Sequence, residues 1–212
     1  MTSETNTSSS GISVSGRRLA ATVAAFALAA CGEVTATPDS GPGECTTPTW
    51  LPVALANASF DDDGAWTVSP LNNPAICEPG MFGVPADSGT LAACFGVVNL
   101  ANQMLTQPVT LPPGATQVRL RGKGCLVTTE PDPAVKDTLD IELLDANTLE
   151  TVASLANWSN LDAGMVCAWT DFELMAPVES AGPPILSMHG VLDDLEITTF
   201  FLDTLELDAY GC

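Results

Sequence analysis

The feature that most constrains the fold is an alternation of apolar and charged residues over short stretches. It covers 118–121 and, more regularly, 139–143, and a period of two is typical of strands with one buried and one exposed face. Pro and Gly interrupt the pattern at 112–114, 130–133 and 181–184, where they favour turns. With no long helical pattern, we expect an all-β sandwich of about ten short strands. Further strand candidates are 66–69, 91–99, 103–110, 151–155, 168–175, 185–192 and 200–208.

Acidic residues dominate the charge. The 212 residues include 26 Asp and Glu but only six Lys and Arg, for a formal net charge of −20 at pH 7. Nucleic-acid binding requires clustered basic side chains that neutralise phosphates, so we expect no nucleic-acid partner. Hydrophobic residues make up 46% of the chain, which excludes the composition of a disordered acidic protein and indicates a folded core.

The first 30 residues have the features of an export signal. Arg17 and Arg18 precede an uncharged run of twelve residues over 19–30, a length that suits a signal peptide and is too short to span a bilayer. The run ends in Leu28-Ala29-Ala30-Cys31, which resembles the lipobox of bacterial lipoprotein signals. The resemblance implies that residues 1–30 are removed and that Cys31 is acylated. The alternative is an ordinary signal peptide with an incidental Cys.

A lipid anchor at Cys31 would fix the protein in the bacterial cell envelope. Several acyl chains hold a protein stably on a membrane, and by the sorting habit of such lipoproteins Gly32 favours the outer membrane. Removal of residues 1–30 leaves four basic and 25 acidic side chains, and the four basic ones lie between Arg119 and Lys136. Charge alone would not attract such a protein to anionic lipid, so the anchor is the expected membrane contact.

Six cysteines remain beyond Cys31. An even number in an exported chain predicts three disulfides, because the compartment is oxidising. Cys-x-x-Cys spacings are absent, which argues against a zinc or thiol-redox site. Among the connectivities that six cysteines allow, we expect Cys45 with Cys212, Cys77 with Cys94, and Cys125 with Cys167.

A series of motifs runs through the expected sandwich domain, residues 49–212, which follows a tether over 31–48 rich in Thr, Pro and Gly. The motifs are 57–61 followed by Trp66, then 105–115, 139–143, Trp169 before Phe172, and 199–207. Together they resemble the jelly-roll domains of the galactose-binding-like superfamily, especially carbohydrate-binding modules of the xylan- and glucan-binding type. The resemblance implies an antiparallel jelly roll with a glycan ligand.

The same resemblance implies a structural calcium ion held by Asp61 and Asp203. Alternation along the last strand places Asp203 on the apolar face of Phe201, Leu205 and Leu207, so we expect it to point inward. A buried carboxylate needs partners, and calcium would require further ligands from backbone carbonyls. The alternative is that Asp203 accepts hydrogen bonds from backbone donors while residues 61–63 form a solvated turn.

Aromatic side chains are the candidate ligand-binding residues, because flat rings stack on sugars. By the resemblance Trp66 belongs to the core. Trp158 lies among turn-forming residues and is the best loop candidate for ligand contact. Trp169 is the second, since its parity opposes that of Phe172 and places it on the other face of its strand. Ordinary packing is the alternative for each.

No catalytic motif is found. His189 is the only His and falls in an expected strand, and no Gly-x-Ser-x-Gly elbow occurs, so we expect no enzyme. The leading hypothesis is a lipid-anchored envelope protein whose non-catalytic carbohydrate-binding domain binds a glycan or an envelope component. The alternative is a structural or protein-interaction surface lipoprotein that contacts envelope proteins and has no sugar site.

Overall fold

The computed structural model describes residues 47–62, 64–178 and 182–212. They belong to one compact unit, Glu44–Cys212. The predicted signal peptide, Cys31 and Cys45 lie outside the described residues. In the described part, no helix has the length and apolarity that crossing a membrane requires.

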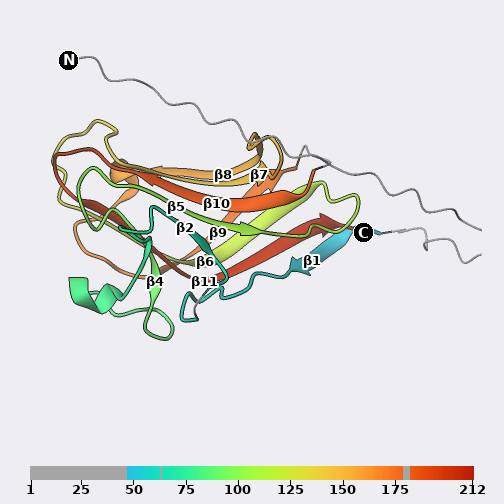
Figure 1. The fold of residues 1–212 in the computed structure, drawn as a ribbon, viewed down its shortest axis with the longest axis horizontal. Helices are drawn as coiled ribbons and strands as arrows, with labels where there is room; N and C mark the ends of the chain where they lie inside the picture. Colours follow the sequence, from blue (N-terminus) through green and yellow to red (C-terminus); the bar gives the residue numbers. More distant parts are fainter. Residues whose placement is uncertain (1–46, 63, 179–181) are drawn as a thin grey trace, which may run out of the picture. The chain divides into compact units, whose positions relative to one another are not determined.

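Eleven strands of the described part form two antiparallel sheets (Figure 1). The six-stranded sheet has the order β3-β4-β11-β6-β9, and β1 also pairs with β11; the five-stranded sheet has the order β2-β5-β10-β7-β8. The chain crosses repeatedly between the sheets, so the predicted all-β jelly-roll sandwich is confirmed. The strands are β1 (Thr49–Val53), β2 (Thr67–Ser69), β3 (Ile76–Cys77), β4 (Ala92–Phe95), β5 (Asn102–Pro108), β6 (Gln117–Thr128), β7 (Thr138–Asp145), β8 (Thr151–Ser159), β9 (Thr170–Pro177), β10 (Pro184–Val191) and β11 (Thr198–Gly211), with two short 3-10 helices, η1 (Pro79–Phe82) and η2 (Asn160–Asp162).

The main core lies between the two sheets. On β7 the alternation predicted from sequence holds: Leu139, Ile141 and Leu143 are fully buried, while Asp140 and Glu142 face outward. Each such apolar side chain contributes about 1.5–3 kcal/mol when it leaves water. Trp66 belongs to the same core, as predicted, and stacks on Phe60 with ring centroids 5.4 Å apart.

A bulge in β11 reverses the facing of its side chains. The pairing of β11 with β6 shifts register between Asp203 and Glu206, and Thr204 has a φ of 53°. An extra residue in one strand restarts the alternation, so Phe200 and Leu202 face the main core before the bulge, and Leu205 and Leu207 face it afterwards. The prediction that Asp203 shares an inward face with Leu205 and Leu207 is therefore wrong.

A second, smaller cluster lies on the outer side of the six-stranded sheet. It contains Ala92, Cys94, Cys125 and Phe201, and we call it the satellite core. Partly buried side chains that pack against it include Cys77, Val84, Cys167 and Trp169. The bulge thus leaves Phe201 and Asp203 on a face that the segment between β3 and β4 covers.

Both disulfides of the described part border this satellite core. Cys77 pairs with Cys94, with Cα atoms 5.9 Å apart, and Cys125 pairs with Cys167, at 5.3 Å. These are two of the three pairings expected from the sequence. The third involves Cys45, which lies outside the described residues.

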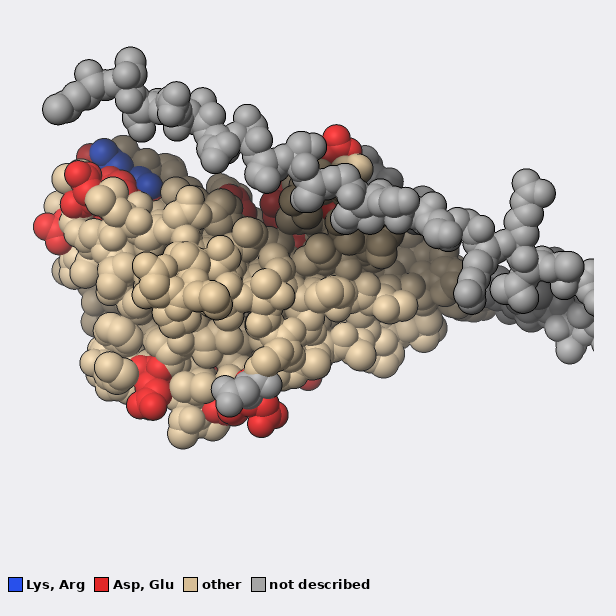
Figure 2. All heavy atoms as spheres, in the orientation of Figure 1, with Lys and Arg blue, Asp and Glu red and all other residues tan. Residues whose placement is uncertain are grey.

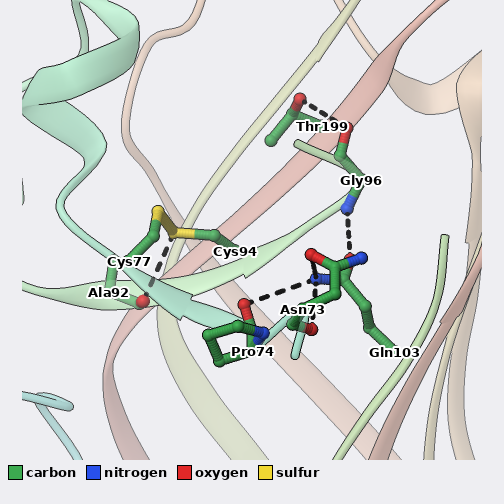
Figure 3. Close-up of a disulfide and its surroundings, with 8 residues drawn as sticks. All are labelled: Asn73, Pro74, Cys77, Ala92, Cys94, Gly96, Gln103 and Thr199. Atoms are coloured by element: carbon green, nitrogen blue, oxygen red, sulfur yellow. Dashed lines mark hydrogen bonds between the residues drawn. A yellow bond between two sulfur atoms is a disulfide. The ribbon is translucent and has the colours of Figure 1, made fainter. Parts of the chain in front are cut away.

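Beside the Cys77–Cys94 disulfide, the fully buried Gln103 fixes two loops (Figure 3). Its Oε1 accepts a hydrogen bond from the Gly96 N–H at 2.8 Å, and its Nε2 donates to carbonyls of Asn73 and Pro74 at 3.2 and 3.4 Å. A buried amide without such partners would destabilise the fold, so these bonds hold the connection that enters β3 and the one that leaves β4.

Candidate functional site

Trp158 lies in β8 and not in a loop. Two register shifts in the pairing of β7 with β8 change the facing of the residues that follow. Trp158 therefore sits opposite the buried Leu139 and turns its ring toward Phe172 of β9, with centroids 5.3 Å apart in an edge-to-face arrangement. The loop position predicted for Trp158 is wrong, because Asn157, Ser159 and Asn160 suggested a turn where an irregular strand runs.

Trp169 lies on the outer side of the six-stranded sheet. It precedes β9 and packs against Phe201, with ring centroids 6.4 Å apart, whereas Phe172 packs against the main core. Its Nε1 donates a hydrogen bond to the Pro85 carbonyl at 2.7 Å. The predicted opposite facing of Trp169 and Phe172 is confirmed, and the structure places Trp158 and Trp169 on different sides of the six-stranded sheet.

The outer surface of the five-stranded sheet carries mostly polar side chains, interrupted by a few apolar ones, and we call it the polar face. On β2, β5 and β10 it has no charged side chain, and Figure 2 shows few charged groups over β5 and β10. On β7 it carries two carboxylates. Its members are Thr67 and Ser69 (β2), Asn102, Met104, Thr106 and Pro108 (β5), Ile185, the buried Ser187, His189 and Val191 (β10), Thr138, Asp140, Glu142 and Leu144 (β7), and Ser154 and Asn157 (β8).

A row of directly opposed residues crosses the centre of the polar face. His189 is aligned with Met104 on one side and with Asp140 on the other, and Asp140 is aligned with Asn157. Strands lie about 4.8 Å apart, so these four residues span roughly 14 Å. That length matches an extended ligand lying across the strands better than a single small group.

Hydrogen bonds pre-order this row. His189 Nε2 donates to Asn102 Oδ1 at 2.9 Å, and Asn157 Nδ2 donates to Asp140 Oδ1. One row away, Thr151 Oγ1 donates to Glu142 Oε1 at 3.1 Å. A carboxylate accepts several hydrogen bonds, so Asp140 and Glu142 each keep capacity for hydroxyl donors from a ligand.

Sequence reasoning missed the polar face as a site. Period two along 139–143 predicted that Asp140 and Glu142 face outward, but it gave no means of aligning them with His189 and Asn157. That alignment depends on the order of β10, β7 and β8 in the sheet.

Three of the four basic residues in the described part, Arg119, Arg121 and Lys123, lie on β6 of the other sheet. Asp208 Oδ2 accepts from Arg119 Nη2 at 2.8 Å and from Arg121 Nη2 at 2.9 Å, and Arg119 lies 4.5 Å from the centre of the Trp50 ring. A hydrogen bond to Asp171 raises the pKa of Lys123. These side chains neutralise neighbouring carboxylates.

The residues proposed for calcium hold protein donors instead. Asp203 is fully buried, and its carboxylate accepts from Ser88 N–H at 2.8 Å, Ser88 O–H at 3.0 Å and Thr204 N–H at 2.6 Å. Asp61 Oδ1 accepts from the N–H groups of Thr90 and Leu91 at 2.7 and 3.0 Å. Burial raises the pKa of Asp203 against the effect of the Ser88 bonds, whereas the Thr90 and Leu91 N–H groups lower that of Asp61.

This donor set does not fit a calcium shell. Calcium takes six to eight oxygen ligands, but the hydrogen bonds to these two carboxylates come from N–H and O–H donors. The Asp87 carboxylate lies beside Asp203, and the Thr204 hydroxyl hydrogen-bonds to both. Nowhere among residues 47–62, 64–178 and 182–212 do three His, Cys, Asp or Glu side chains cluster in a way that could hold a metal ion.

Comparison with known proteins gives likeness at the level of strand arrangement. No protein-family model and no curated protein matches the sequence. A family 61 carbohydrate-binding module solved with β-1,4-galactotriose is 18% identical, with 72% of this chain and 95% of that chain covered and a TM-score of 0.49. An enzymatically active tailspike domain of bacteriophage CBA120 is 13% identical. The match covers 73% of this chain and 21% of that chain, with a TM-score of 0.48. A xylan-binding domain from Paenibacillus barcinonensis is 14% identical. The match covers 74% of this chain and 95% of that chain, with a TM-score of 0.44.

Proposed function

We propose that this chain is a lipid-anchored protein of the bacterial envelope whose sandwich binds a neutral glycan, without catalysis, through the polar face. The observation that carries the proposal is the aligned row of Met104, His189, Asp140 and Asn157 across four strands. It joins hydrogen-bonding groups of several kinds in one open strip on a rigid sheet.

The chemistry of the strip suits sugar hydroxyls. The Asn157 amide and the Asp140 carboxylate offer a donor and an acceptor side by side, as neighbouring hydroxyls require. Met104 supplies an adaptable apolar contact for the C–H face of a ring. The described part of the polar face carries no Trp, Tyr or Phe, so the stacking energy of an aromatic platform is missing and we expect weak binding.

Charge selects among glycans. The polar face carries Asp140 and Glu142, while Arg119, Arg121 and Lys123 pair with carboxylates on the other sheet. An anionic sugar such as a uronate would meet carboxylates without a partner cation, which opposes binding. We therefore expect neutral oligosaccharides to bind and uronate-containing ones to be rejected.

The membrane part of the proposal depends on Cys31. Acylation of Cys31 predicts incorporation of labelled palmitate into the protein when it is expressed in a Gram-negative host, and its loss in Cys31→Ser. A Cys31→Ser variant that still takes up the label and fractionates with outer membranes would contradict the anchor.

The glycan part is tested by calorimetry with two matched sets of oligosaccharides, neutral xylan or glucan fragments and their uronate-bearing counterparts. Binding of the neutral set alone supports the proposal, and Asn157→Ala should weaken it severalfold. Gln117→Ala is the control, since Gln117 is an exposed amide side chain on the other sheet. Absence of any glycan signal, together with co-purification of envelope proteins, would favour a protein-docking role instead.

A further inference from the structure

Two carboxylates from distant parts of the chain bind one short segment, residues 88–91. Asp61 lies between β1 and β2, and Asp203 lies at the bulge of β11. Asp203 holds Ser88 through both its N–H and its O–H, and Asp61 holds the N–H groups of Thr90 and Leu91. We call this arrangement the loop clamp.

The clamp leaves little room for anything between the carboxylates and the segment. A Cβ atom added to Gly89 would lie 1.8 Å from Asp61 Oδ2, so the backbone packs directly against that carboxylate. Gly89 also has a φ of 53°, a conformation that other residues adopt at a cost. A glycine here permits both the turn and the close approach.

In each carboxylate, one oxygen accepts at least two hydrogen bonds. Each carboxylate oxygen has two lone pairs. Asp61 Oδ1 accepts two N–H donors, and Asp203 Oδ1 accepts the Ser88 O–H and the Thr204 N–H. Each N–H also directs its positive end toward the oxygen that accepts it, so donors and a cation would compete at Asp61 Oδ1 and Asp203 Oδ1.

We propose that the loop clamp takes the place of the structural calcium ion that the sequence resemblance implied, so that the sandwich folds and stays folded without a metal. The clamped segment follows Val84 and Pro85: the Val84 side chain packs against the satellite core, and the Pro85 carbonyl accepts the Trp169 indole N–H. The N–H donors of residues 88–91 thus fix this segment to the two carboxylates, as a bound cation would otherwise do. The proposal is independent of glycan binding.

The test measures thermal melting and amide hydrogen exchange of the purified full chain. The melting temperature should be the same in excess EGTA and in millimolar calcium. Asp61→Asn should lower it by about 2–4 °C and speed exchange at the amides of Thr90 and Leu91. Asp62→Asn is the matched control: it removes the same charge one residue away, from an exposed side chain outside the clamp, and should change neither readout.

Two outcomes would overturn the proposal. One is a calcium-induced rise of several degrees in the unsubstituted protein that Asp61→Asn abolishes. The other is unchanged exchange at Thr90 and Leu91 in Asp61→Asn. Ser88→Ala tests the second arm of the clamp without altering a buried charge, and it should lower the melting temperature equally in EGTA and in calcium.

Discussion

The ring of Trp158 meets that of Phe172 edge to face, with centroids 5.3 Å apart. Trp158 belongs to β8 at the edge of the five-stranded sheet and Phe172 to β9 at the edge of the six-stranded sheet. The pair therefore closes one side of the sandwich, and the aromatic side chain that looked most suited to a ligand serves to join the two sheets.

Replacing Trp158 by Ala should destabilise the fold without altering glycan binding. Loss of a large, half-buried aromatic side chain costs about 2–3 kcal/mol, below the range for fully buried rings. Chemical denaturation measures this change, and calorimetry well below the melting temperature measures binding. Glycan binding that disappears while stability is unchanged would restore Trp158 as a ligand contact.

The substitution Asp208→Asn should cost about 1–3 kcal/mol of unfolding free energy. Asp208 is almost fully buried and accepts three hydrogen bonds from Arg119 and Arg121, and its loss leaves two guanidinium groups close together without their shared acceptor. Glu206→Gln is the control. Glu206 also pairs with Arg121, at 2.9 Å, but its side chain is 60% exposed, so we expect a cost below about 1 kcal/mol. Equal costs for the two variants would contradict this account.

Acidification should have opposite effects on the stabilisation that the two carboxylates of the loop clamp, Asp61 and Asp203, contribute. N–H donors lower the pKa of Asp61 below its usual value of 3.8, so its stabilisation is complete above that pH and is lost as the pH falls. Burial raises the pKa of Asp203, which lies near Asp87 and opposite Lys123. Ionisation of Asp203 therefore lowers the free energy of unfolding as the pH rises from 3.8 through the pKa of the folded state.

Melting curves between about pH 2.5 and 6 measure this difference. Asp61→Asn should lose less stability on acidification than the unsubstituted protein, and Asp203→Asn should lose more. Parallel pH profiles for the three proteins would show that neither carboxylate is coupled to folding in this way.

The part of the fold predictable from sequence is the part fixed by local alternation. Leu139, Ile141 and Leu143 face the core as their spacing predicts, because β7 is regular over these residues. The β11 bulge was not predictable. Thr204 adopts a positive φ where the sequence has neither Gly nor Asn, and the alternation around it continues without a visible break.

The candidate site was less accessible to sequence reasoning, because it depends on sheet order and on partners far along the chain. Asp61 and Asp203 were identified as a pair, but their partners Ser88, Thr90 and Leu91 carry no signal of that role. The same holds for His189, which becomes part of a surface only when β10 lies between β5 and β7.

The most direct test of the central claim is a nuclear magnetic resonance titration of the isotope-labelled protein with a neutral xylan or glucan oligosaccharide. We expect chemical-shift changes at Asn102, Asp140, Asn157 and His189, and none near Trp169 or on the outer side of the six-stranded sheet. Saturable changes confined to that other sheet, or no change at millimolar oligosaccharide, would contradict it.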